Sequence, residues 1–295
     1  MNPWIRRAAI TVVSIAALAA AVVALATQLA AQKRNRHVDV AVAPVAFAVD
    51  AQAIERGRYL YVSRGCTDCH GASGGGRVFV DDGKGLKLAG PHISAGAGSV
   101  TAAYRDEDWV RAVRHGVKPD GRPTMVMPSE DYNRLTDADL GALVAYVKQM
   151  PATTGGAAVL ELPLPMRVLY GLGAIKDAAA RIDHRVPPQQ PVAEGLTVEH
   201  GKYVANMCLG CHGPQLAGGK IPSGPPDWPA AARLAPGEGS VMATRYASAD
   251  AFVKVLKTGV RPDGSRIAVM PFEALSQLSD TDARALHLYL KSLTQ

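Results

Sequence analysis

Two short runs contain the residues whose types and spacing indicate redox chemistry. Each run has the pattern Cys-x-x-Cys-His, and together residues 66–70 and 208–212 hold all 4 cysteines of the 295-residue chain. Two thiols separated by two residues can bond to the two vinyl groups of one haem, and the next histidine then reaches the iron. The pattern predicts two covalently attached haem c groups, with these attachment residues and iron ligands: Cys66, Cys69 and His70 for one, and Cys208, Cys211 and His212 for the other.

Two other cysteine chemistries compete with haem attachment. Two Cys-x-x-Cys pairs can bind zinc, but zinc ribbons rarely separate their halves by about 140 residues, and zinc needs no histidine directly after each pair. A thioredoxin-like dithiol expects a βαβ context, which the chain lacks. Haem is therefore the favoured interpretation, and no cysteine is left for a structural disulfide.

An internal repeat surrounds the two runs. Residues 116–121 (Gly-Val-Lys-Pro-Asp-Gly) recur as residues 259–264 (Gly-Val-Arg-Pro-Asp-Gly), and a Met-Pro pair follows each copy. The distance from His70 to Met127 is 57 residues, and that from His212 to Met270 is 58. A unit of about a hundred residues is thus present twice.

The repeat also indicates the remaining iron ligands, because a thioether or an imidazole usually completes the coordination. Met127 and Met270 occupy the same place in the repeat, whereas Met125 is matched by Ala268. The other candidates have no repeat partner, so we expect core positions for the methionines and surface or supporting roles for the histidines: Met166, Met207 and Met242; His92, His115, His184, His200 and His287.

A ligating histidine normally donates its second ring nitrogen to an acceptor. The Gly90-Pro91 loop offers the Pro91 carbonyl to His70. For His212, the order of residues suggests the Gly224-Pro225-Pro226 loop, but aligning the shared Gly-x-Gly-Ser-Val segments (96–100 and 237–241) places Ala232 opposite Pro91. The second acceptor stays open between these two.

Helical patterns open and close each unit. Thr136 and Ser279 are predicted N-caps, with Asp139 and Asp282 three positions later as a variant of the capping box. Apolar residues then recur at helical spacing (Leu143, Tyr146, Val147, Met150; Leu286, Tyr289, Leu290, Leu293). The middle of each unit is rich in Gly and Pro and has no alternating run long enough for a sheet, so an all-α fold is expected.

Residues 8–32 contain no charge and are long enough to span a bilayer as a helix. Arg6, Arg7 and a small-x-small segment at residues 24–26 also fit a cleaved signal peptide, but the apolar stretch exceeds the usual length for one. An uncleaved anchor is favoured, and either interpretation exports the remainder. Basic residues at 33–36 oppose the positive-inside rule.

The formal net charge of +6 does not indicate a nucleic-acid partner. Five basic residues simply flank the apolar stretch (Arg6, Arg7, Lys33, Arg34, Arg36), and the chain has no basic face with interleaved aromatic residues.

Both halves resemble class I cytochrome c domains. Each has an N-terminal helix with a glycine (Gly57, Gly201) leading into Cys-x-x-Cys-His, a Met-Pro loop, and a C-terminal helix with an aromatic residue (Tyr146, Tyr289). One departure is Ala205, which stands where the first half has Tyr61. The predicted order is an anchor (1–31), a linker (32–50), a first cytochrome domain (51–152), a helical strap packed between the domains (153–193) and a second cytochrome domain (194–295).

The resemblance extends to membrane-anchored dihaem cytochromes c that serve periplasmic dehydrogenases and respiratory oxidases. It implies an inner-membrane, single-pass protein with periplasmic haem domains. Such a protein carries electrons from a dehydrogenase to a terminal oxidase or a soluble cytochrome, and does no substrate chemistry. The alternative is a dihaem enzyme such as a peroxidase or thiosulfate dehydrogenase, which needs one haem with a displaceable or unusual ligand. The matched pair Met127 and Met270 argues against such a haem, and the oligomeric state stays open.

Overall fold

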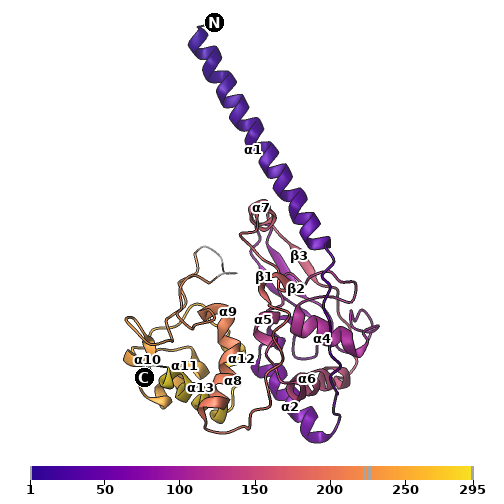
Figure 1. The fold of residues 1–295 in the computed structure, drawn as a ribbon, viewed down its shortest axis with the longest axis vertical. Coiled ribbons are helices and arrows are strands. Elements are labelled where there is room, and N and C mark those ends of the chain that lie inside the picture. Colours follow the sequence, from indigo (N-terminus) through magenta and orange to yellow (C-terminus); the bar gives the residue numbers. More distant parts are fainter. Residues whose placement is uncertain (1, 222–223, 225–226, 294–295) are drawn as a thin grey trace.

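A single long helix, α1 (Pro3–Asn35), projects from a body made of two helical units that lie side by side (Figure 1). The structure is a computed structural model that describes residues 2–221, 224 and 227–293. The described residues do not include Pro225 and Pro226 of one predicted acceptor loop, nor residues 1 and 294–295. The chain is mainly helical, as its sequence predicts.

The first unit is built around two crossing helices, with its other helices on either side of the cross. Its helices are α2 (Ala51–Ser63), α3 (Cys66–His70), α4 (Asp106–His115), α5 (Ser129–Tyr132) and α6 (Asp137–Gln149). At the crossing of α2 and α6, a Cβ on Gly57 would lie 2.0 Å from the carbonyl oxygen of Ala142, so only glycine permits this approach. The predicted stripe of α6 is buried, including Leu143, Val147 and Met150.

The second unit repeats this arrangement with a shorter first helix. Its elements are α8 (Val198–Val204), η2 (Ala205–Cys208), α9 (Leu209–His212), α10 (Val241–Thr244), α11 (Ala249–Thr258), α12 (Phe272–Leu275) and α13 (Asp280–Ser292). A Cβ on Gly201 would lie 1.9 Å from the carbonyl oxygen of Ala285, which reproduces the glycine crossing. Ala205 begins a 3-10 turn beyond the crossing, so the loss of the Tyr61 counterpart leaves the crossing intact.

The prediction that no sheet forms is wrong for the first unit. Strands β1 (Arg77–Asp81), β2 (Lys87–Gly90) and β3 (Val159–Glu161) form an antiparallel sheet in the order β1-β2-β3. Leu88 pairs with Leu160, about 70 residues further along the chain. Because the strands are short and depend on this distant pairing, no local alternation of apolar and polar residues predicts them.

The strap between the units is also placed differently from the prediction. Its helix α7 (Leu164–Leu172) packs against α1 and not between the two units. A Cβ on Gly171 would lie 1.9 Å from the carbonyl oxygen of Ala26, and Ala26 and Ala30 are buried there. A 3-10 turn, η1 (Ala179–Arg181), then lies against α5 of the first unit.

Candidate functional site

An apolar cavity in the first unit is bordered by three of the predicted haem residues. Cys66, His70 and Met127 line it together with apolar side chains of α4 and α6. The lining combines a thiol, an imidazole and a thioether with an otherwise apolar wall. This donor set and this wall fit a haem whose iron takes one ligand from each face.

A short hydrogen bond orients His70 at the edge of this cavity. Its Nδ1 lies 2.9 Å from the carbonyl oxygen of Pro91, which can only accept, so Nδ1 carries the proton and Nε2 keeps its lone pair. The loop reaches α3 because position 90 is glycine: a Cβ there would lie 2.1 Å from the carbonyl oxygen of Cys69. Burial also lowers the pKa of His70, which favours the neutral imidazole that binds iron.

His212 has the matching hydrogen bond in the second unit. Its Nδ1 lies 2.8 Å from the carbonyl oxygen of Ala232, the residue that the repeat alignment places opposite Pro91. Gly218 permits this approach, since a Cβ there would lie 2.4 Å from the carbonyl oxygen of Ala231. Burial lowers the pKa of His212 as well.

The methionines separate into two groups. Met270 is partly buried against the same core cluster as Cys208, as Met127 is against that of Cys66. Met242 is fully buried in the core of the second unit, in agreement with a packing role. Met125 does not line the cavity that Met127 borders.

The spare histidines are buried to a degree that the sequence does not reveal. His92, His200 and His287 are nearly inaccessible to solvent, so a surface role is wrong for them. Each has a polar partner: Ser94 for His92, Asp282 for His200 and the Tyr246 carbonyl for His287. His115 is also buried, with its Nδ1 3.1 Å from Nδ1 of His184.

The cysteines do not converge on a metal-ion site. Among the described residues, no three His, Cys, Asp or Glu side chains are grouped so as to hold a metal ion. The two pairs lie instead on the separate helical turns α3 and η2–α9.

Comparison with known families agrees with this arrangement. Residues 54–151 match the family described as "Cytochrome c", and residues 199–290 match "Cytochrome C oxidase, cbb3-type, subunit III". The chain carries two cytochrome c domains. Together they bind two c-type haems.

Three curated relatives extend the similarity along most of the chain. The fructose dehydrogenase cytochrome subunit of Gluconobacter japonicus is 25% identical over 85% of this chain and 54% of its own length. The gluconate 2-dehydrogenase cytochrome c subunit of Pantoea cypripedii is 29% identical over 55% of this chain and 38% of its own length. A diheme cytochrome c-type protein of Cereibacter sphaeroides is 26% identical over 84% of this chain and 88% of its own length. The chain thus spans about half or less of the first two relatives.

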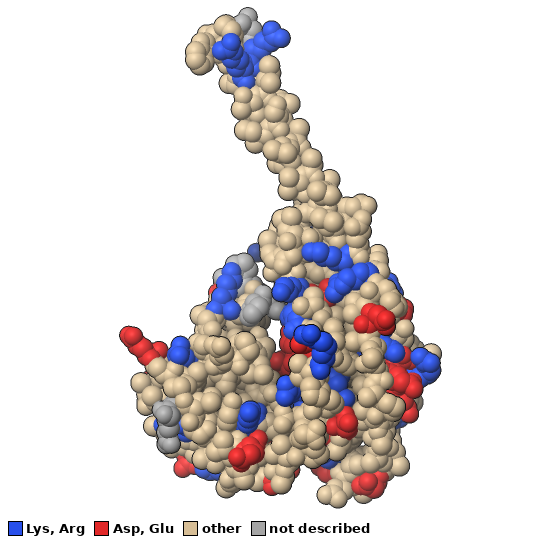
Figure 2. All heavy atoms as spheres, in the orientation of Figure 1, with Lys and Arg blue, Asp and Glu red and all other residues tan. Residues whose placement is uncertain are grey.

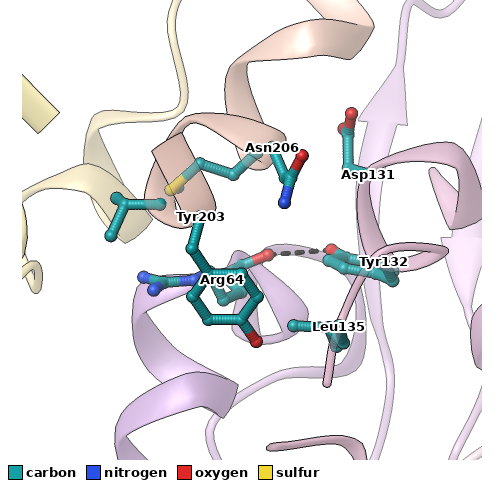
Figure 3. Close-up of a pocket in the computed structure, with 8 residues that line it drawn as sticks. Arg64, Asp131, Tyr132, Leu135, Tyr203 and Asn206 are labelled. Carbon is teal, nitrogen blue, oxygen red and sulfur yellow. Dashed lines mark hydrogen bonds between the residues drawn. The ribbon is translucent and has the colours of Figure 1, made fainter. Parts of the chain in front are cut away.

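The interface between the two cytochrome domains brings both Cys-x-x-Cys-His segments to one place. The short helix α5, which follows Met127, contacts η2 and α9 of the second domain, while α12, which follows Met270, contacts α2 and α3 of the first. Tyr132 donates to the carbonyl oxygen of Arg64 at 2.8 Å, and the amide of Gly210 donates to Asp131 at 3.0 Å. Figure 3 shows Arg64, Asp131 and Tyr132 around a small pocket at the interface, with Tyr203 and Asn206 opposite Tyr132 and Asp131.

Two tyrosines that the sequence analysis missed cross this interface. The hydroxyl of Tyr203 accepts from the Thr136 amide at 3.3 Å and donates to Asp139 at 2.6 Å. The hydroxyl of Tyr59 accepts from the Ser279 amide at 3.0 Å and donates to Asp282 at 2.7 Å. Thr136 and Ser279 are N-caps as predicted, but the carboxylate half of the capping box is wrong, because a tyrosine of the other domain occupies that place.

The two tyrosine contacts differ in the basic residues that surround their carboxylates, Asp282 and Asp139. Asp282 is fully buried and accepts from Arg64 and from His200, each at 2.8 Å. Burial alone would raise the pKa of Asp282, but the Arg64 guanidinium holds it below its usual range. Asp139 instead pairs with Arg56 at 2.8 Å, and that arginine is partly exposed. Tyr59 and Tyr203 each lie two residues after the crossing glycine, and this recurrence in the repeat was the available signal for them.

Proposed function

We propose that the chain is a membrane-anchored dihaem cytochrome c that carries electrons from a periplasmic dehydrogenase to a terminal oxidase or a soluble cytochrome. The observation that carries the proposal is the cavity that Cys66, His70 and Met127 share, in a unit that the chain contains twice. The dehydrogenase as donor is supported by relatives whose names are those of dehydrogenase cytochrome subunits. The acceptor follows from the high potential that methionine ligation gives.

In this proposal each domain supplies the same four groups. Two cysteines would hold the haem, and a histidine and a methionine would be the protein ligands of its iron: Cys66, Cys69, His70 and Met127; Cys208, Cys211, His212 and Met270. The haem supplies a reversible one-electron change at iron. With a histidine and a methionine available to each iron, neither haem would keep an open position for a substrate, which supports a carrier over an enzyme.

The anchor is supported by the contacts at the end of α1. Ala26 is fully buried against Gly171, so cleavage after residue 26 would remove a residue of the folded packing. Lys33 donates to the carbonyl oxygen of Gly171 at 2.7 Å, and Arg36 pairs with the buried Asp177 at 2.5 Å. These partners give the basic cluster a structural reason to follow the span in spite of the positive-inside rule.

Membrane washing and N-terminal sequencing test the anchor. Carbonate-washed inner membranes should retain the protein, with the mature chain still containing residues 8–31. A mature N-terminus at Thr27 and a soluble periplasmic protein would contradict it.

The carrier function is tested with purified holoprotein. The reduced protein is challenged with hydrogen peroxide and the oxidised protein with thiosulfate, and neither should support turnover. Sustained turnover at about 1–1000 per second would replace the carrier with the enzyme alternative. Gentle solubilisation followed by identification of co-purifying proteins should recover a dehydrogenase.

A further inference from the structure

The strap helix α7 presents an apolar face that no described segment covers. Leu164, Leu169 and Leu172 are 45%, 44% and 59% exposed, respectively. On a helical projection they share a sector of about 140° with Pro165 and Val168. Buried Tyr170 lies on the opposite side, and buried Gly171 borders the sector next to Leu164. Exposed leucines grouped on one helix face are typical of a surface that contacts a protein or a membrane.

The position of α7 along α1 identifies that partner. The uncharged segment of α1 begins at Ala8, and a helix of about 20 residues at 1.5 Å per residue crosses a hydrocarbon core of about 30 Å. That length ends near Thr27, beside Ala26, whose carbonyl is the closest neighbour of Gly171 in α7. The apolar face of α7 therefore lies at the level where the bilayer core meets the headgroups.

Hydrogen bonds and an ion pair fix the position of α7 along α1. Lys33 bonds to the carbonyl oxygens of both Tyr170 and Gly171 at the end of α7, and Arg36 bonds to Asp177 just beyond it. Tyr170 also donates to Asp177 at 2.8 Å. The angle between the two helices is thus set by polar contacts as well as by the close approach at Gly171.

Basic residues surround the same end of the body. Lys33 and Arg34 end α1, and Arg167 and Lys176 are exposed on and just after α7. Figure 2 shows lysine and arginine side chains over the end of the body from which α1 projects. Long basic side chains beside an apolar helix face suit a lipid surface, because their stems cover apolar area while their charges meet phosphate groups.

We propose that α7 is an interfacial helix that inserts Leu164, Leu169 and Leu172 into the outer surface of the bilayer spanned by α1. Two attached elements, and not a single flexible tether, then define the orientation of the first cytochrome domain to the membrane. This inference rests on the proposed anchor, and it adds a second membrane contact that the anchor alone does not require.

A photoreactive lipid tests the proposal in the full-length holoprotein. The protein is reconstituted into phosphatidylcholine vesicles containing phosphatidylglycerol and a lipid with a diazirine near the headgroup, and labelled peptides are mapped by mass spectrometry. Peptides of α1 and of α7 should both be labelled. The matched control is the α13 peptide with Leu288, which is 41% exposed in the second domain and should stay unlabelled.

A double variant, Leu169→Ser with Leu172→Ser, sharpens the result. Labelling of α7 should fall several-fold while α1 labelling and haem content stay unchanged, since both side chains are exposed. Labelling of α7 no stronger than that of the Leu288 peptide would overturn the proposal. Absence of label from α1 itself would overturn the anchor instead, so the two failures are distinguishable.

Two other occupants of the face are also outcomes of the test. A Leu172→Cys variant that forms disulfide-linked pairs in the vesicles, with α7 unlabelled by lipid, would assign the face to a second copy. Lipid labelling of α7 that appears only after the co-purifying dehydrogenase is stripped away would assign it to that partner. Either result contradicts the insertion of α7 into lipid.

Discussion

The two cytochrome domains share their fold and their crossed tyrosines, but they differ at the positions that meet between them. The residue two places before the first cysteine is Arg64 in one domain and Asn206 in the other. The residue four places after the Met-Pro methionine is Asp131 in the first domain and Ala274 in the second. The residue before the crossing glycine is Arg56 in one and His200 in the other. The haem ligands repeat, whereas the charges of the interface do not.

This difference separates two requirements on the chain. Haem binding needs the same thiols, imidazole and glycine contacts in each domain, so these recur. The interface instead pairs Arg64 of the first domain with the buried Asp282 of the second, and Asn206, at the repeat position of Arg64, does not reproduce that pair. A duplicated unit can therefore keep its cofactor site while its contact surface diverges.

The largest expected effect comes from removing one haem attachment. Cys66→Ala with Cys69→Ala should eliminate one haem and unfold the first domain, because the haem fills an apolar cavity in its core. Cys208→Ala with Cys211→Ala is the matched variant for the second domain. Intact mass under denaturing conditions should show a single covalent haem in each, and two haems in either variant would contradict the attachment sites.

The buried carboxylates provide the next comparison. Asp282→Asn leaves the Arg64 guanidinium, whose side chain is 6% exposed, without its counter-charge. We expect a loss of about 3–5 kcal/mol in the free energy of unfolding. Asp139→Asn should cost only about 1–2 kcal/mol, because Arg56 is 24% exposed and has Glu194 as a second partner. Denaturant unfolding of the holoprotein measures both values. Equal losses would show that the deeper burial of Arg64 does not raise the cost of removing its partner.

Much of this picture is predictable from sequence, and the remainder has a common physical cause. The Cys-x-x-Cys-His runs, the repeated Met-Pro and the glycine crossings are local patterns with a fixed chemical meaning. The alignment of the repeat also named Ala232 as one of two candidate acceptors for His212, and the structure shows Ala232 in that role. The tyrosine crossings join residues more than 60 and 200 positions apart, and β3 pairs across about 70. No local periodicity encodes such contacts, and for the same reason the buried role of His200 was not foreseen.

The distal ligands give a third comparison, between two methionines of one loop. Met127→Ala should abolish the weak sulfur-to-iron absorption band of one haem and lower its potential by on the order of 0.1 V, within the range of about 0.8 V that axial ligands span. Met270→Ala should do the same to the other haem. Met125→Ala is the control in the first domain and should leave band and potential unchanged in a spectroelectrochemical titration. If Met125→Ala lost the band and lowered the potential while Met127→Ala left both unchanged, Met125 would be the ligand.

The last effect concerns Asp131, an interface carboxylate whose repeat counterpart in the second domain is Ala274. Burial raises the pKa of Asp131 to about 7, with the Glu130 charge adding to the shift. The folded protein therefore keeps a proton that the unfolded chain loses at about pH 4, so stability from this group declines as the pH rises from about 4 to 7. Asp131→Asn keeps an acceptor for the Gly210 amide but does not titrate. At pH 8 it should be more stable than wild type, with no gain at pH 4, in paired unfolding curves.

A gain from Asp131→Asn that is equal at both pH values would contradict the titration of Asp131. Glu107→Gln serves as a control, because Glu107 is exposed on α4 of the first domain.

We expect the interface between the domains to let one chain pass electrons between its two haems. Photoreduction of a small fraction of the oxidised holoprotein, followed by transient absorption at the bands of each haem, tests it most directly. Transfer within one chain should give a first-order redistribution of the electron between the haems, and the rate constant should be independent of protein concentration. A redistribution whose rate rises in proportion to protein concentration would mean that electrons move only between molecules, and it would contradict the account.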